Sequence, residues 1–560
     1  MNHNFAVFAP EHRPAGRADG SGPLIGRRSF AVLLAALLTL LVVLRSPENL
    51  ATPQFYAEDG GLFFQEAYNN GFITSLNVPT AGYLNTLPRL MAGAALLVPL
   101  EMAPLVVALL ALLVQMLPVF YLLSSRATAI IPSFPRRCAV ALLYVILPNS
   151  DEVYVSGTNA QWHLMLVGAL ILLIPPPANR LGRAAETFLA AIFAFTGPGS
   201  LLLLPLVLLV LRGRCTPGRG LQGGAALAVV AAGAVTQLAF LVTSPRIAGA
   251  RVSGLTSLDP GEIVRIISTH TFYSTFLGEQ RFTRVHESFG LAPHIAGLLV
   301  VMLLGWSVVR HRVRPLLLLG YLALVTIFLS LLFPSNELTL WLKPWFGSRY
   351  YFHATLFLVC AVADLLTRKG PWLFLGALLA VPLATLAVPS DFFLPKWPDT
   401  RYRDQIEQFR SLPAGARFFI PTLPEPWGMT LTRKADALPV APRLARLQPL
   451  PQEAGARLDP VWVSDAGDRI RISGSAADPV AGAPAGGVTV LVDGRLFPAV
   501  YGQAWSFRGG DLAEPSETAF QRVIPVSEIG RGMHSLALLV LTHDRTAVFR
   551  PAAPFVFTLP

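Results

Sequence analysis

The residues whose chemistry stands out are two adjacent carboxylates, Glu58 and Asp59, within the segment FYAEDGGLFFQEA. They follow the first long apolar run of a chain in which charged residues make up only 14%. A carboxylate in a cavity beside a membrane can act as a general base and take a proton from a hydroxyl nucleophile. Asp59 can instead cap the short amphipathic helix predicted for GGLFFQEAYNNG, because Asp side chains accept backbone N–H bonds at helix starts. The two roles are compatible.

The composition predicts a polytopic membrane protein. The chain has 560 residues, of which 53% are hydrophobic, and a formal net charge of +11. A nucleic-acid-binding protein would gather its basic residues into a patch interleaved with aromatics. Here the basic residues instead separate apolar runs, which is typical of membrane topology. We therefore expect the lipid bilayer as a partner and no nucleic acid.

The apolar runs predict about eleven membrane-spanning helices. The stretch at 87–100 is expected to lie on the outer membrane surface, because every later Arg-rich loop then falls on the cytoplasmic side. Eight spans are long and three are short, and they are predicted at 29–44, 103–123, 163–175, 221–242, 293–309, 315–333, 350–366 and 371–388, and at 137–148, 185–196 and 200–211.

This topology places the N-terminus in the cytoplasm and the C-terminal tail on the periplasmic side of an inner membrane. The tail from 456 to 560 alternates apolar and polar residues between turns such as VDGR, which indicates a small β-sandwich-like domain. The predicted parts are a cytoplasmic segment 1–28, a transmembrane domain 29–388 with long outer loops 45–102, 149–162, 243–292 and 334–349, a Pro-rich linker 389–455 with one short helix, and a β domain 456–560.

The layout has a recognisable order: an acidic pair after the first span, an amphipathic helix, a surface helix around LPRL, many spans and an outer soluble domain. In this order the sequence resembles the C-type superfamily (GT-C) of integral-membrane glycosyltransferases, whose donors are polyprenyl-phosphate-linked sugars. The resemblance covers residues 29–390. It implies that Asp59 is the catalytic Asp of the first outer loop. The family's usual Asp-Glu order is reversed here, which leaves the role of Glu58 open.

The second outer loop, LPNSDEVYVSGTNAQWHL, combines hydrogen-bonding side chains with an aromatic face, as a sugar site requires. The alternative is a solvated loop with an interfacial Trp anchor, in which His163 is a helix-end polar residue rather than a metal ligand. The candidate sugar- or acceptor-binding residues are Asp151, Glu152, Asn159, Gln161, Trp162 and His163.

A lipid-phosphate leaving group needs cations, and Arg is best suited to phosphate. The candidates are Arg89 in LPRL and Arg349 in GSRYYFH, beside Tyr350. Arg349 can instead be an interfacial residue within an aromatic belt. Metal use stays open: Asp59 with Asp151 or Glu152 could hold Mg²⁺ or Mn²⁺. No other cofactor is expected.

The sequence therefore predicts a bacterial inner-membrane glycosyltransferase that moves a hexosyl or pentosyl unit, with inversion, from a polyprenyl-phosphate donor to a glycan or lipid acceptor on the outer face. One alternative is a lipid-linked glycan transporter or flippase, which would need charged residues inside spans and related halves. A second alternative is a glycan polymerase or ligase, which would not need the acidic pair after the first span.

Overall fold

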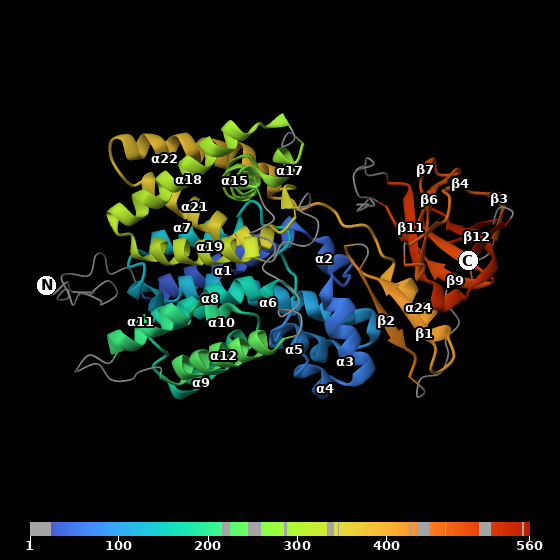
Figure 1. Cartoon of the computed structure of the whole chain (residues 1–560), viewed down its shortest axis with the longest axis horizontal. Helices are drawn as coiled ribbons and strands as arrows, with labels where there is room; N and C mark the ends of the chain where they lie inside the picture. Colours follow the sequence, from blue (N-terminus) through green and yellow to red (C-terminus); the bar gives the residue numbers. More distant parts are fainter. Residues whose placement is uncertain are drawn as a thin grey trace. The chain divides into compact units, whose positions relative to one another are not determined.

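The chain forms two compact units in the computed structural model (Figure 1), and each is described by itself. The helical unit contains Met1–Pro47, Val78–Leu87 and Ala111–Leu394. The mixed unit contains Glu48–Asn77, Pro88–Leu110 and Pro395–Pro560. The structure describes residues 24–214, 224–244, 259–284, 288–332, 341–344, 346–424, 427–434, 447, 449–464, 466–502, 517–550 and 554–559, so most of the predicted cytoplasmic segment lies outside the described residues.

The helical unit is built from long apolar helices joined by short turns. Its elements are α1 (Leu24–Arg45), α6 (Ala103–Leu123, which begins in the mixed unit), η3 (Ser125–Ala129), α7 (Phe134–Val145), α8 (Ala160–Leu173), α9 (Arg180–Ala194), α10 (Gly199–Leu202), α11 (Leu204–Arg214), α12 (Gly224–Thr243), α15 (Pro260–Ser268), η4 (Thr269–Tyr273), α16 (Ser274–Leu277), α17 (Glu279–Phe282), α18 (Leu291–His311), α19 (Arg314–Leu332), η6 (Ser348–Tyr351), α21 (Phe352–Leu365), α22 (Pro371–Pro382), η7 (Leu383–Ala387) and α23 (Val388–Asp391).

Six helices of the described residues are long and apolar enough to cross a membrane, which is fewer than the eleven expected. The five other predicted spans correspond to α7, α8, α9, α11 and α21, which have between 11 and 15 residues. Fifteen helical residues cover about 22 Å, whereas the hydrocarbon core is about 30 Å thick. The six long segments are Gly26–Arg45, Leu100–Leu123, Gly224–Thr243, Leu291–His311, Arg314–Leu331 and Pro371–Asp391.

The short helices end where the sequence contains Pro and Gly. The break after α9 is at Gly197, whose φ of +66° is a left-handed conformation that favours glycine. A Cβ on Gly197 would also lie only 2.0 Å from Oε1 of Gln161. The turn between α9 and α10 therefore packs directly on the side chain of Gln161.

Arg45, the last residue of α1, is 1% exposed and ties three segments together. Its guanidinium donates to the carbonyl oxygens of Val145 at 2.7 Å, Asp391 at 3.0 Å and Phe392 at 2.9 Å. It also donates to Oγ of Ser150 at 3.2 Å. The end of α1, the segment around Val145 and Ser150, and the segment at Asp391 and Phe392 are thereby fixed to one another.

The mixed unit joins the segments Glu48–Asn77 and Pro88–Leu110 to the C-terminal region. Its helical elements are α2 (Glu48–Ala51), η1 (Asp59–Phe64), α3 (Gln65–Asn70), α4 (Phe72–Leu76), most of α5 (Thr86–Ala95), η2 (Leu100–Met102), α24 (Tyr402–Ser411) and α25 (Val526–Ile529). A two-stranded hairpin follows α24 and consists of β1 (Arg417–Pro421) and β2 (Gly428–Thr432).

The C-terminal region is β-rich, as predicted, and forms two six-stranded sheets. The first has the order β10-β11-β6-β4 with β5 and β7 on β6, and the second β3-β13-β12-β8-β9 with β14 on β12. β6 contacts β12 and β10 contacts β8, so the sheets pack on each other. The strands are β3 (Pro449–Glu453), β4 (Gly455–Leu458), β5 (Trp462–Val463), β6 (Arg469–Asp478), β7 (Ala483–Pro484), β8 (Gly487–Val492), β9 (Arg495–Pro498), β10 (Val500–Tyr501), β11 (Ala519–Pro525), β12 (Gly532–Leu541), β13 (Val548–Arg550) and β14 (Phe555–Leu559).

The VDGR turn joins β8 to β9. Val492 pairs with Arg495, which leaves Asp493 and Gly494 as a two-residue loop. Both have positive φ, +48° and +81°, as the tightest hairpin turn requires.

Candidate functional site

Glu152, in the second outer loop, is held against the turn that precedes α21. Its Oε1 lies 2.8 Å from Nη1 of Arg349 and accepts from the backbone N–H of Gly347 at 3.3 Å. Its Oε2 accepts from the backbone N–H of Arg349 at 3.0 Å and from Oγ of Ser348 at 3.3 Å. An ion pair supported by three further hydrogen bonds fixes the two segments more firmly than an isolated pair would.

Arg349 is paired but still partly open. Its side chain is 31% exposed, and the centre of the guanidinium lies 5.1 Å from the ring centroid of Tyr350. A guanidinium and a phenol side by side are groups that can bind the oxygens of an anion. The guanidinium of Arg349 thus lies over the ring of Tyr350, in a cation–π contact.

Two buried indoles flank Tyr350. The ring centroids of Trp162 and Trp341 lie 5.2 Å and 5.7 Å from that of Tyr350, and the two side chains are 7% and 3% exposed. Among the residues that the structure describes, neither indole Nε1 has a hydrogen-bond partner, and neither does Nδ1 of the adjacent His353. Buried polar atoms are nearly always paired. The two indole N–H groups can donate to a polar group of a ligand or to an ordered water, and Nδ1 of His353 can accept, because its Nε2 donates to the carbonyl oxygen of Trp162 at 3.2 Å.

Asp151 lies beside this cluster and carries a perturbed carboxyl group. Its Oδ1 accepts from Oγ of Ser348 at 3.1 Å. Burial, and then the charge of Glu152, raise the pKa of Asp151 to about 7. Glu279, at the start of α17, shares a hydrogen bond with Asp151, and burial followed by repulsion from Asp151 raises the pKa of Glu279 well above its usual range. Such a pair holds one proton between its two carboxyl groups at neutral pH.

Glu279 and Asp391 are site residues that the sequence did not reveal. The Asp391 carboxylate accepts the backbone N–H groups of Asn149 at 3.1 Å, Glu279 at 2.7 Å and Gln280 at 3.3 Å. It thereby joins the start of α17 to the second loop, which brings Glu279 against Asp151. The only sequence signal is Gly278, whose φ of +87° makes the sharp turn into α17.

Two other predicted ligand residues, Asn159 and His163, are bonded by the protein itself, whereas Oε1 of Gln161 is buried and has no hydrogen-bond partner among the described residues. Nδ2 of Asn159 donates to the carbonyl oxygen of Glu152 at 2.7 Å. The ring nitrogens of His163 lie 2.8 Å from the hydroxyl of Tyr144 and 2.9 Å from the carbonyl oxygen of Val153. His163 is also only 2% exposed. The structure thus favours its interpretation as a helix-end polar residue, and the Gln161 side chain packs against the turn after α9.

In the mixed unit, Asp59 is the first residue of η1, a π-helical turn that continues into α3. It is 5% exposed, whereas Glu58 is half-buried. Glu58, not Asp59, occupies the capping position, and its side chain makes no capping hydrogen bond. The interpretation of Asp59 as an N-cap is therefore wrong, although its negative charge is still favoured by the helix start.

Gly60 and Gly61 allow η1 to lie against the chain around the β1–β2 hairpin. A Cβ on Gly60 would come within 2.8 Å of Cγ2 of Thr422, and one on Gly61 within 2.9 Å of the carbonyl oxygen of Gly428. The two glycines after the acidic pair are thus needed for packing, and they hold the backbone of Asp59 in place.

Arg89 is fully buried and paired within the mixed unit. Its Nη1 lies 2.6 Å from Oε2 of Glu66, and its guanidinium lies 5.3 Å from the ring centroid of Phe63. Because Glu66 and Phe63 belong to the helix that follows the acidic pair, Arg89 fixes that helix. This arrangement supports a positioning role for Arg89 rather than a direct contact with phosphate.

The predicted site residues therefore fall into two sets. Glu58, Asp59 and Arg89 belong to the mixed unit. The second-loop residues and the Arg349–Tyr350 pair belong to the helical unit, where the structure brings them together. Within the described residues, no group of three or more His, Cys, Asp or Glu side chains could hold a metal ion. No protein-family model matches the sequence, and no curated protein is significantly similar to it.

Proposed function

We propose that this protein is a membrane glycosyltransferase that uses a polyprenyl-phosphate-linked sugar and transfers it to a hydroxyl of a glycan or lipid acceptor. The observation that carries the proposal is the cluster around Arg349. It combines a cation held by Glu152, a phenol and two buried indoles with unpaired N–H donors. A phosphate next to a sugar ring needs this combination of a fixed cation, hydrogen-bond donors and aromatic surface.

In the proposed reaction, Arg349 stabilises the negative charge that develops on the departing lipid phosphate. Tyr350 lies against the same guanidinium and adds a hydroxyl donor. The Nε1 groups of Trp162 and Trp341 offer hydrogen bonds to sugar oxygens. Glu152 positions Arg349, since it also binds the backbone of that residue.

Asp59 acts as the general base. The acceptor hydroxyl loses its proton to the carboxylate and its oxygen forms the new bond to the anomeric carbon. The bond from that carbon to the phosphate oxygen breaks on the opposite side, and the lipid phosphate leaves with the electron pair. A single displacement of this kind inverts the anomeric centre. The burial of Asp59 and its fixed backbone suit a base that must hold one position.

The test is Asp59→Asn in the full-length protein, assayed with a polyprenyl-phosphate sugar alongside thermal melting in detergent. Asn cannot accept the proton, so transfer should fall by about 10²–10⁴-fold. The melting temperature should hardly change, because Asn keeps the shape of the side chain. Glu48→Gln, which removes a carboxylate from the same unit, is the matched control and should transfer normally.

Glu58→Gln should reduce transfer less than Asp59→Asn does. The opposite order would exchange the roles of the two carboxylates. Normal transfer by both variants would make the pair structural and refute the mechanism. Movement of the lipid-linked sugar across vesicles without any transfer would instead identify the protein as a transporter.

A further inference from the structure

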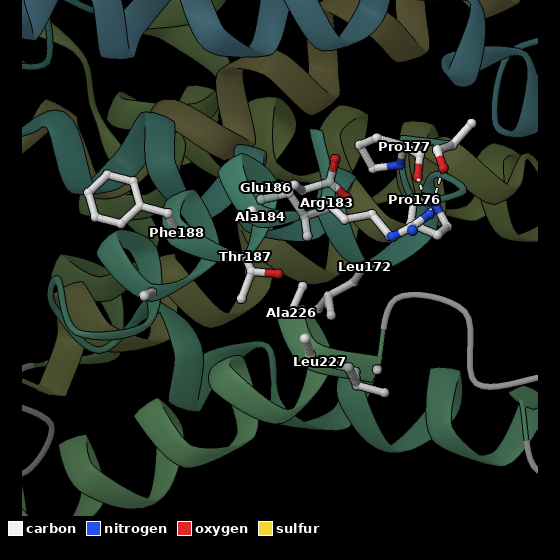
Figure 2. Close-up of a pocket in the computed structure, with 15 residues that line it drawn as sticks. Leu172, Pro176, Pro177, Arg183, Ala184, Glu186, Thr187, Phe188, Ala226 and Leu227 are labelled. Carbon is white, nitrogen blue, oxygen red and sulfur yellow. Dashed lines mark hydrogen bonds between the residues drawn. The ribbon is translucent and has the colours of Figure 1, made fainter. Parts of the chain in front are cut away.

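A large cavity opens in the helical unit away from the cluster around Arg349. It has a volume of about 1080 Å³ and lies between the end of α8, the first turns of α9 and the start of α12. Figure 2 shows Thr187 from α9 close to Ala226 and Leu227 from α12. The volume is at the upper end of the range for ligand pockets. None of the predicted site residues lines it.

The lining is mostly apolar. Leu172, Pro176 and Leu227 contribute apolar walls. Figure 2 shows Arg183 beside Pro176 and Pro177, and Phe188 at the far side of the view. The cavity therefore has a basic end and an apolar end.

The basic end carries uncompensated positive charge. Nη1 of Arg183 donates to the carbonyl oxygens of Ala178 at 2.6 Å and Pro177 at 3.3 Å, which anchors the guanidinium without neutralising it. Arg180 is exposed one turn earlier on α9. In the described part of the chain, neither arginine forms an ion pair with a carboxylate.

The one carboxylate in the cavity wall is already neutralised. Oε2 of Glu186 lies 2.6 Å from Nη2 of Arg126, and Nε of Arg126 donates to the carbonyl oxygen of Pro175 at 2.6 Å. Glu186 is buried, so an anion at the basic end would meet the guanidinium of Arg183, with Arg180 one turn away on the same helix, and a carboxylate that is paired with its own cation.

The outer surface of α9 is also apolar. Leu181 and Phe188 are 81% and 65% exposed, as expected for side chains that face lipid tails rather than water. On the predicted topology this end of the helices lies at the cytoplasmic face, where anionic lipids are attracted to basic pockets between spans.

From these observations we propose that the cavity binds an anionic glycerophospholipid. The phosphate headgroup lies against Arg183 and Arg180, and an acyl chain occupies the apolar part between α8, α9 and α12. The charge complementarity selects the headgroup, and the apolar walls select a lipid rather than a soluble anion. This site is independent of the proposed transfer reaction.

The experiment uses the full-length protein in detergent with added dioleoylphosphatidylglycerol, and measures thermal melting and bound lipid by native mass spectrometry. Phosphatidylglycerol should raise the melting temperature by several degrees and remain bound. Phosphatidylcholine, which has acyl chains but no net charge, should neither raise the melting temperature nor remain bound. The same is expected of glycerol phosphate, which is charged but has no acyl chain.

Two variants localise the effect. Arg180→Gln with Arg183→Gln should weaken phosphatidylglycerol binding about 25-fold, at roughly fivefold for each arginine. Ala184→Trp, at an exposed lining position of α9, should block the cavity and abolish retention of the lipid. The matched control is Arg310→Gln with Arg312→Gln, which removes two exposed arginines at the end of α18 and should leave binding unchanged.

Equal stabilisation by phosphatidylcholine would refute the role of the arginines. Equal stabilisation by glycerol phosphate would show an anion site that takes no acyl chain. An equal loss in the control variant would assign the effect to general surface charge, and undiminished binding by Ala184→Trp would place the lipid outside the cavity. Each of these results would overturn the proposal.

Discussion

Oε1 of Glu152 lies 2.8 Å from Nη1 of Arg349, although 197 residues separate them in the sequence. The same carboxylate also accepts two backbone N–H groups of the turn at Gly347 and Arg349. One side chain thus holds both the position and the charge of the guanidinium. We expect this contact to be stronger than an ordinary surface ion pair.

The first prediction concerns the strength of that contact. A double-mutant cycle with Glu152→Gln and Arg349→Gln should give a coupling free energy of about 1–3 kcal/mol, because both groups are partly buried and each loses its charged partner. The control cycle uses Asp364 and Arg368, a pair at 2.7 Å within one helix, which should give about 0.3–0.5 kcal/mol. Chemical or thermal unfolding in detergent measures both, and equal couplings would contradict the prediction.

The second prediction concerns pH. Because the pKa of Asp151 in the folded protein is about 7, above the value in an unfolded chain, the folded state binds the proton more tightly. The stability that this group contributes is therefore complete in acid and is lost as the pH rises towards and through about 7. Glu279 acts in the same direction. Asp151→Asn should flatten this dependence, and its melting temperature should exceed that of the parent at pH 8.

Melting curves between pH 5 and pH 8 test this. Asp399→Asn is the control, because that carboxylate lies in the mixed unit and is paired with Arg545 at 3.0 Å. A parent and an Asp151→Asn variant with the same pH dependence would show that the carboxyl pair does not retain its proton.

The third prediction concerns Arg45. Arg45→Met removes four hydrogen bonds and the contact with the ring of Tyr154, whose centroid lies 4.2 Å from the guanidinium. The acceptors stay buried, so the free energy of unfolding should fall by about 2–4 kcal/mol. Arg136→Gln, at an exposed position, should change it by less than about 0.5 kcal/mol. Melting temperature and resistance to limited proteolysis report the loss, and similar values for the two variants would count against the role of Arg45.

The fourth prediction concerns topology. With a cytoplasmic N-terminus, six crossings would return the tail to the cytoplasm, whereas eleven would place it outside. The Arg-rich loops favour eleven, so the five shorter helices must together complete an odd number of crossings. A reporter that is active only in the cytoplasm, fused after residue 395, should be silent. A fusion after residue 126 should be active, and activity at both positions would overturn the predicted topology.

The sequence revealed the long helices and a β-rich C-terminal region, but not how its strands pair. Apolar runs marked the long helices, and the Asp493–Gly494 turn marked a hairpin, because both signals are local. β11 carries no clear apolar pattern, because its buried residues include Arg522, which is 0% exposed. That arginine is satisfied by the carbonyl oxygen of Phe419 at 2.7 Å and by Oε1 of Gln405 at 2.9 Å, and no local pattern reveals such partners.

The candidate site, too, depends on contacts between residues far apart in the sequence, which local patterns do not reveal. Glu152 and Arg349 could each be chosen by residue type and loop, but their contact depends on how α21 packs. Glu279 and Asp391 stand in no motif, and the only local signal is the glycine that precedes Glu279. The Asp391 carboxylate accepts three backbone N–H groups, and these hydrogen bonds determine where Glu279 lies. The role of Asp59 in transfer stays a prediction, whereas its place at the start of a helix could be read from the sequence.

The hydrogen bonds of Arg45 impose an order on how the protein can be completed. Arg45 is synthesised early, but two of its acceptors, the carbonyl oxygens of Asp391 and Phe392, follow 346 and 347 residues later. The guanidinium at the end of α1 can therefore form all its hydrogen bonds only after nearly the whole helical unit has been synthesised. A nascent chain that stops before the last span keeps this charge incompletely bonded, however well its other helices pack. Synthesis of the segment that contains Asp391 and Phe392 thus also completes the hydrogen bonding at the end of α1.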